Sequence, residues 1–210
     1  MSAGNYLEDA VLNHIFGKES YAAPTVHVAL STADPGEDAS GLAEPLGGAY
    51  DRVATEAADW NAASGGMLNN AVDLVFAEAT EAWGVITHFA LFDKAIASHA
   101  ITGVTTGGAG SAAFIVSGDI TSELEEGAIL RVHGSTGNDG LYTVRAGSSY
   151  NGGTDRTTVN VEEAVSDATA DGTLQTLGNL LFSGTLQSSK EIEAGDTAKF
   201  GANDLEITAD

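Results

Sequence analysis

The spacing of hydrophobic residues changes from a helical period near the start of the chain to an alternating one further on. Within residues 5–16, Leu7, Val11 and Ile15 recur every four residues, which predicts one short helix with a single apolar face. Asn5 is a suitable N-cap residue, and Gly17 is a suitable stop. Because one face of this helix is apolar, we expect the helix to lie on a sheet.

The residues that follow predict β-strands separated by turns. Residues 25–32 alternate, with Val26, Val28 and Leu30 on one face. Residues 84–92 are apolar on both faces, which is typical of a central strand that is covered on both sides. Further strands are expected at residues 50–57, 72–76, 180–186 and 205–207, with turns at residues 61–70 and 193–196.

A stretch with a different composition and its own strand pattern interrupts this pattern after the central strand. It opens with the Gly-rich run Thr106–Ser111 and has its own short strands, expected at residues 113–117, 128–133, 141–146 and 157–162. Four or five strands in about 65 residues suggest a small barrel or sandwich. We therefore predict a mainly β protein with two domains. Residues 1–99 and 178–210 form a discontinuous β-sandwich core with a short N-terminal helix, and residues 100–177 form an inserted small β domain.

Charge adds a further constraint. The 210 residues include 30 Asp and Glu against 8 Lys and Arg, a net charge of −22. Because the acidic residues are spread along the chain, we expect a carboxylate-coated surface that repels itself at low salt. At molar salt the Debye length falls to about 3 Å, and the repulsion is screened. This favours a protein adapted to high salt over an ordinary acidic protein, and so few cations argue against a nucleic-acid partner.

Several classes of protein are excluded or disfavoured by simple absences in the sequence. The chain has no cysteine, so it has no disulfide framework and no thiolate metal site. It has no apolar run of about 18 residues, so we expect no membrane insertion. The first residues have no basic region followed by an apolar core, so we expect no secretory signal.

The sequence offers few candidate catalytic or metal-binding residues. The five histidines are His14, His27, His88, His99 and His133, and no two of them have metal-ligand spacing on one element. His88 lies in the predicted central strand, where a hydrogen-bonded core or interface histidine is favoured over a catalytic base. The turn Asn138–Gly140 offers one carboxylate, whereas a calcium site needs about six oxygens or more.

Adjacent carboxylates and the two tryptophans complete the candidates. Glu125–Glu126 and Glu162–Glu163 would point to opposite faces of a strand, which disfavours a shared-proton pair. Trp83 is predicted to lie in the core. Trp60 is also predicted there, with an exposed sugar- or partner-binding position as the alternative. We therefore predict no catalytic, cofactor-binding or metal-binding residue, and no cofactor.

Six segments, in order, resemble a known family. They are NYLEDAVLNHIFG, APTVHVALSTADP, GGAYDRVA, VDLVFAEAT, EAWGVITHFALFD and LLFSGTLQSSKEIEAGDTAKFGANDLEIT. Together they resemble the small tailed-phage virion proteins usually labelled tail fibre proteins, over residues 5–93 and 180–208. Short members run almost directly from the FALFD strand to the LLF strand. Here about 80 residues intervene, and they are similar to a small β module inserted in other phage structural proteins.

This resemblance implies a non-enzymatic structural protein of a tailed virus particle, with no catalytic residues carried over. We expect it in the virion as a symmetric homo-oligomer, with a trimer favoured, in contact with other virion proteins. The inserted domain would project outward and contact host surface glycan or S-layer. Together with the acidity, the resemblance implies a virus of a halophilic, archaeal host.

A tail fibre or baseplate appendage and a capsid turret or decoration both stay open, and a glycan-binding module without architectural duty is the alternative. An enzyme such as a depolymerase is disfavoured, because no carboxylate pair has a plausible spacing.

Overall fold

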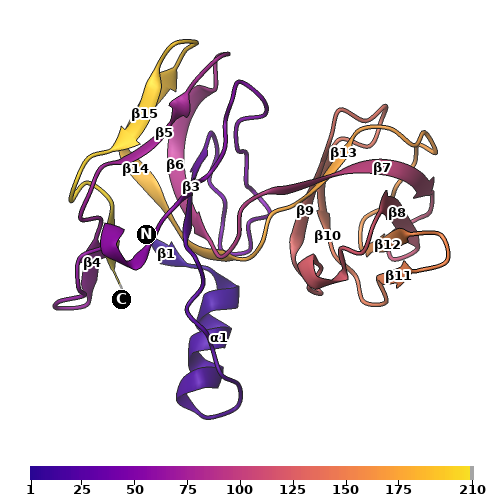
Figure 1. The fold of residues 1–210 in the computed structure, drawn as a ribbon, viewed down its shortest axis with the longest axis horizontal. Coiled ribbons are helices and arrows are strands. Elements are labelled where there is room, and N and C mark those ends of the chain that lie inside the picture. Colours follow the sequence, from indigo (N-terminus) through magenta and orange to yellow (C-terminus); the bar gives the residue numbers. More distant parts are fainter. Residues whose placement is uncertain (209–210) are drawn as a thin grey trace. The chain divides into compact units, whose positions relative to one another are not determined.

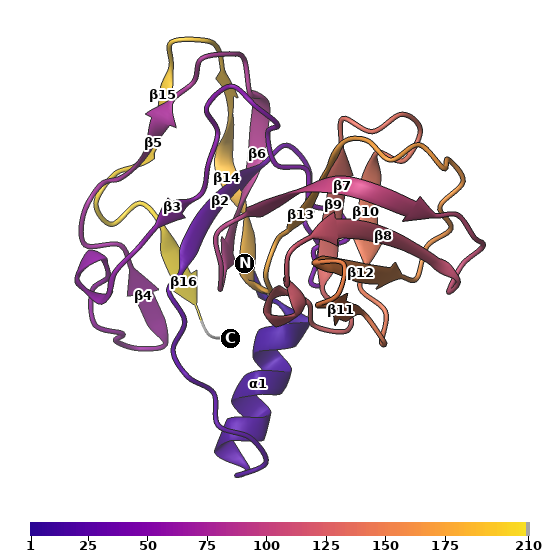
Figure 2. The same cartoon turned by 45° about the vertical axis from the view of Figure 1, so that its right-hand side comes forward.

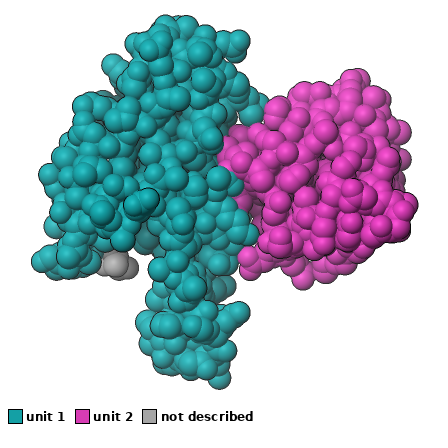
Figure 3. Space-filling view, viewed as in Figure 1, with its two compact units in different colours: residues 1–95, 179–210 teal, residues 96–178 magenta. Residues whose placement is uncertain are grey.

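The computed structural model describes residues 1–208. The chain divides into two compact units, which Figure 3 colours separately. Unit 1 comprises residues 1–95 and 179–210, and unit 2 comprises residues 96–178. The predicted fold class, mainly β with a short N-terminal helix, is confirmed.

Unit 1 is built on a five-stranded antiparallel sheet in the order β1-β14-β6-β2-β3 (Figures 1 and 2). The strands are β1 (Ser2–Ala3), β2 (His27–Ser31), β3 (Val53–Ala54), β6 (Gly84–Phe92) and β14 (Leu180–Ile192). The strand β6 lies in the middle, as the doubly apolar pattern predicts. Its first half is covered on one face only, because Val85 is 46% exposed, whereas Phe89–Phe92 are buried.

Two short ribbons cover this sheet and complete the core of unit 1. One pairs β5 (Leu74–Glu78) with β15 (Thr197–Phe200), and the other pairs β4 (Met67–Asn69) with β16 (Glu206–Thr208). Apolar side chains of the ribbons, such as Phe76 and Ile207, belong to one cluster with those of the sheet, such as Ile86. The prediction of residues 61–70 as a turn throughout is wrong, because β4 lies within them.

The helix α1 (Asn5–Ile15) follows β1 directly. Gly4 rather than Asn5 occupies the N-cap position, so the capping prediction is wrong. The Gly4 N–H donates to the Leu181 carbonyl (2.9 Å), and a side chain at this position would collide with the Leu180 carbonyl. This close approach of the backbone to β14 requires glycine.

Only the first turn of α1 packs on the hydrophobic core of unit 1, through Tyr6 and Leu7. No residue of α1, which the structure describes in full, is buried. Figures 1 and 2 show α1 extending beyond the strands of unit 1. The expectation that this helix lies along a sheet is therefore wrong for most of its length.

Unit 2 is a seven-stranded sheet in the order β10-β9-β13-β7-β8-β12-β11. The strands are β7 (Ala97–Thr105), β8 (Ala112–Ser117), β9 (Ile129–His133), β10 (Gly140–Thr143), β11 (Ser149–Asn151), β12 (Arg156–Val161) and β13 (Thr173–Thr176). The residues after β10 also bond to β12, through Arg145 N–H to the Asn160 carbonyl (2.9 Å). The sheet therefore curls round its own core, which includes Phe114, Leu130 and Val159.

The chain leaves and re-enters unit 1 at neighbouring positions. The Asn179 N–H donates to Asp93 Oδ1 (2.7 Å), and the Asp93 N–H donates to the Asn179 carbonyl (3.2 Å). Unit 2 begins four residues before the predicted boundary at residue 100, because β7 starts at Ala97 and pairs with β13. That each unit folds as an independent domain stays a prediction.

Candidate functional site

The histidines lie on separate elements, and two of them, His88 and His99, have polar side chains beside the ring. On β6, the ring nitrogens of His88 lie 2.8 Å from Thr87 Oγ1 and 3.2 Å from Thr185 Oγ1. On β7, His99 Nε2 lies 2.9 Å from a Glu123 oxygen on the short 3-10 helix η2 (Thr121–Glu123). Across residues 1–208, no three or more His, Asp or Glu side chains are grouped so that they could hold a metal ion.

The turn Asn138–Gly140 uses its polar groups to hold its own loop. Asp139 Oδ1 accepts from the Ser135 N–H (2.7 Å), and the buried Asn138 side chain donates to the Asp167 carbonyl (2.9 Å). Nearby, hydrogen bonds from Thr136 hold the pKa of Asp171 below its usual range. These groups stabilise the loop by satisfying backbone N–H and carbonyl groups.

The adjacent carboxylates do not converge on one point. Glu163 accepts from the N–H (2.8 Å) and the hydroxyl (2.9 Å) of Thr143, whereas Glu162 is exposed. Glu125 and Glu126 are both exposed. None of these carboxylates is recorded within hydrogen-bonding distance of its neighbour, as a shared proton in a catalytic pair requires.

The two tryptophans have different environments, both in unit 1. Trp83 is 5% exposed and donates from Nε1 to the Gly48 carbonyl (2.9 Å), as expected of a core residue. Trp60 is half-buried and donates to Thr55 Oγ1 (2.9 Å). Its ring packs against the core of unit 1 and also lines a groove, described below.

A completely buried ion pair joins the loop before β3 to the sheet, and sequence reasoning missed it. Arg52 donates to both oxygens of Glu44 at 2.9 Å, and both side chains have no exposed surface. The guanidinium also donates to the Lys94 carbonyl (3.0 Å) and stacks 3.6 Å over the Phe92 ring. Burial raises the pKa of Tyr50, whose hydroxyl donates to Glu44 (3.0 Å). This cluster fixes the 44–52 loop against β6 and has no opening for a substrate to enter.

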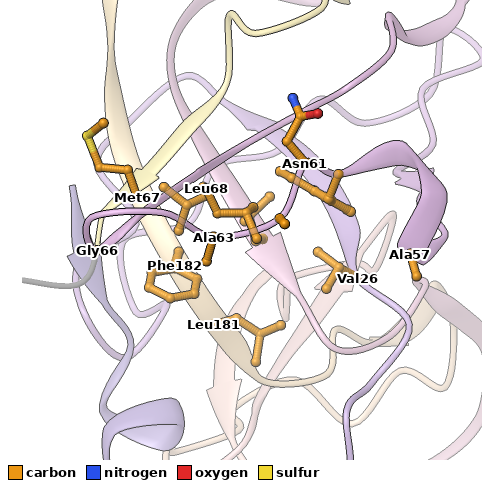
Figure 4. A pocket seen from close by; sticks show the side chains of 13 residues that line it. Val26, Ala57, Asn61, Ala63, Gly66, Met67, Leu68, Leu181 and Phe182 are labelled. Carbon is orange, nitrogen blue, oxygen red and sulfur yellow. The ribbon is translucent and has the colours of Figure 1, made fainter.

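A large apolar recess, which we call the apolar groove, also lies in unit 1. It has a volume of about 720 Å³ and is formed by β4, β14, β16, the chain before β2 and the 3-10 helix η1 (Ala57–Asp59). Figure 4 shows the side chains of Val26, Leu68, Leu181 and Phe182 gathered between Met67 and Ala57. A volume of this size is typical of sites that bind a ligand or a side-chain cluster.

The chemical character of the apolar groove is uniform. None of the described residues that line it is charged, and Asn61 supplies the one side-chain amide. That amide donates to Asn69 Oδ1 (2.9 Å) and Asn203 Oδ1 (3.2 Å), so it is already engaged within unit 1. The groove can therefore bury apolar side chains, but it offers no acid, base or nucleophile for catalysis.

A second apolar surface lies at the far end of α1. Val11, Leu12, Ile15 and Phe16, which we call the helix tip, are 40%, 53%, 67% and 72% exposed. Contiguous exposed apolar side chains of this kind mark interaction surfaces. The sequence pattern shows that these residues share a helix face, but it does not show that the rest of unit 1 leaves them uncovered.

No helix within residues 1–208 is both long enough and apolar enough to cross a membrane.

Comparison with known proteins identifies the family. A family model described as "Podophage GP4 fiber I protein gp80" matches residues 2–130, which is more than half of the chain. The matched residues include α1 and β1–β6 and continue into unit 2 as far as β9. No curated protein matches the chain. The chain therefore belongs to the podophage fibre protein family represented by gp80.

Proposed function

We propose that this protein is a non-enzymatic structural component of a tailed virus particle, carried on its surface as an appendage. Unit 1 is the part that assembles, and unit 2 is the part displayed toward the host. Membership of a fibre protein family is the observation that carries this proposal. The localisation that follows is the virion, after synthesis in the host cytoplasm.

The way unit 2 is inserted into unit 1 supports assembly through unit 1 and display of unit 2. The ends of unit 2 meet at Asp93 and Asn179, where two backbone N–H groups and the Asn179 side-chain amide, which donates to Asp93 Oδ2 (3.0 Å), tie β6 to β14. Because β6 and β14 pair with each other on the unit 1 side of Asp93 and Asn179, the sheet of unit 1 needs no strand from unit 2. A core of this kind carries an inserted domain without contributing strands to it, which suits display.

The state of the polar side chains supports a structural rather than a catalytic role. The carboxylates of Asp139, Glu163 and Asp171 accept local hydrogen bonds, and the apolar groove contains no ionisable group. The two apolar surfaces of unit 1 suit protein–protein contact. We propose that copies assemble as a symmetric homo-oligomer, with a trimer favoured.

The position on the particle and the partner of unit 2 are further parts of the proposal. A fibre or baseplate appendage is favoured over a capsid turret or decoration, because the matched family is described as a fibre protein. Unit 2 would contact host surface glycan or S-layer. The net charge of −22 supports a host that lives at high salt, where the repulsion between carboxylates is screened.

An adsorption assay tests this function. Peptides of the chain should be found in purified virus particles, and the purified full-length protein should slow adsorption of virus to its host cells. A matched variant that lacks residues 96–178 should not slow adsorption, while its Trp60 and Trp83 emission shows that unit 1 is folded. Absence of the chain from the particle would refute the structural role, and a monomeric protein that still blocks adsorption would favour the glycan-binding alternative.

A further inference from the structure

The helix tip is held away from the body of unit 1 by the way α1 is anchored. The Gly4 N–H donates to the Leu181 carbonyl (2.9 Å), and the Asn5 N–H donates to the Glu37 carbonyl (3.0 Å). With Tyr6 and Leu7 packed on the core, the first turn is fixed. The 11 residues of α1 then extend about 16 Å from that point.

The helix tip cannot reach the apolar groove of its own chain in this arrangement. Leu181 lines the apolar groove and also anchors the start of α1, so the start of the helix lies beside the groove and the tip lies at the opposite end. Figures 1 and 2 both show α1 extending away from the strands that form the groove. The helix tip can therefore enter such a groove only on another molecule.

Charge favours a second copy of this chain as that molecule. Copies that each carry −22 repel one another over most of their surfaces. The lining of the apolar groove has no charge. The end of α1 is nearly neutral, because Lys18, one of four lysines in the chain, offsets Glu19. These two surfaces are therefore the places where two copies meet with the least repulsion, and Glu56 and Asp59 on η1 beside the groove would attract Lys18.

The exposed area of the helix tip is also large enough for such a contact. Phe16, at 72% exposure, presents roughly 110–180 Å² of surface, and the four side chains of the tip together present roughly 400 Å². A copy that gives one tip and receives another buries about twice that area. The result is close to the roughly 800 Å² per partner of a stable interface.

We propose that the helix tip of one copy seats in the apolar groove of a second copy, so that exchanged helix ends join the copies. This inference rests on the homo-oligomer of the proposed function and names its contact. Each copy gives one tip and receives one, so a reciprocal pair or a ring of copies closes into a symmetric assembly in which every tip and every groove is occupied.

Disulfide trapping between two differently tagged chains tests the contact, since the natural chain has no cysteine. One chain carries Ile15→Cys in the tip, and the other carries Ala63→Cys in the groove. Mild oxidation of the mixture should give the mixed dimer at least tenfold more efficiently than the control pair Ile15→Cys and Val75→Cys. Val75 is 49% exposed on β5 and lies outside the groove, so it reports random collision.

Sedimentation analysis of substitutions at the tip gives a second readout. Phe16→Gln should lower the measured mass toward that of one chain, whereas Val75→Gln should leave it unchanged. Both positions are exposed, so circular dichroism should be unaffected by either change.

An oligomer that survives Phe16→Gln and gives no mixed dimer would overturn the exchange but leave the homo-oligomer standing. A monomeric natural chain would overturn both. A disulfide that forms within a single chain carrying both cysteines, without a dimer, would show that the tip reaches its own groove and would also overturn the exchange.

Discussion

Replacing Arg52 by Met should strongly destabilise unit 1, because it leaves a buried carboxylate without its cation. The side chain of Glu44 has no exposed surface, and Arg52 supplies two hydrogen bonds to it at 2.9 Å. The change also removes the hydrogen bond to the Lys94 carbonyl and the stacking on Phe92. Met retains the apolar stem, so loss of packing is a minor part of the effect.

The magnitude follows from the burial of the pair. Removal of one partner from a buried ion pair costs about 3–5 kcal/mol, because the remaining charge cannot regain its hydration. Replacing both partners, as Glu44→Leu with Arg52→Met, should cost clearly less than the sum of the two single changes. A coupling of about 1–3 kcal/mol between contacting residues is expected. The exposed pair Lys199–Asp73, with side chains 55% and 47% exposed, serves as a control, and Lys199→Met should leave the free energy of unfolding nearly unchanged.

Urea unfolding followed by tryptophan fluorescence measures these changes in unit 1 alone. Both tryptophans of the chain, Trp60 and Trp83, belong to unit 1, so unfolding of unit 2 does not contribute to the signal. A cost below about 1 kcal/mol for Arg52→Met, or a double variant that costs the full sum of the singles, would refute the assigned role of the pair.

Three further results are expected. Burial, and then the charge of Arg52, lower the pKa of His27. Unit 1 should therefore lose stability as pH falls from the unfolded pKa of about 6.5 through the folded value, and His27→Gln should remove that part of the slope in urea titrations between about pH 5 and 8. Equal pH dependence of the free energy of unfolding in the natural chain and in His27→Gln would contradict this role of His27. Raising KCl from about 0.1 to 1 M should increase the free energy of unfolding, since the Debye length shrinks from about 10 to 3 Å. Circular dichroism and unfolding curves that do not respond to salt would contradict the role given to the −22 charge. A variant that joins Ala95 to Asn179 by a short Gly-Ser turn should keep the tryptophan emission of unit 1, and a failure to fold would show that the two units are not independent.

Local pattern was sufficient to predict the elements with strong periodicity. The apolar run of β6 and the four-residue spacing of α1 both correspond to elements of the structure. By contrast, β7 (Ala97–Thr105) is mostly Ala, Ser, Thr and Gly, with Ile101 as its one buried apolar residue. Its strand conformation is fixed by pairing with β8 and with β13, which lies about 75 residues further along the chain.

The functional surfaces depend on contacts that no local pattern contains. The apolar groove combines Val26, Leu68, Phe182 and Ile207, which come together only when β4 pairs with β16 against the sheet. The exposure of the helix tip follows from the close backbone contact at Gly4, which directs α1 away from the sheet. In both cases the residue types were visible in the sequence, but the arrangement depends on tertiary structure.

Display of unit 2 on the outside of a virus particle is the central part of the proposed function. Immunogold electron microscopy of intact virions at high salt, with antibody raised against residues 96–178, measures this. We expect gold at a fixed position on the particle surface. Label on a tail appendage is the favoured result, and label on the head would indicate a turret or decoration. Intact particles that contain the protein and yet bind no gold would contradict display of unit 2.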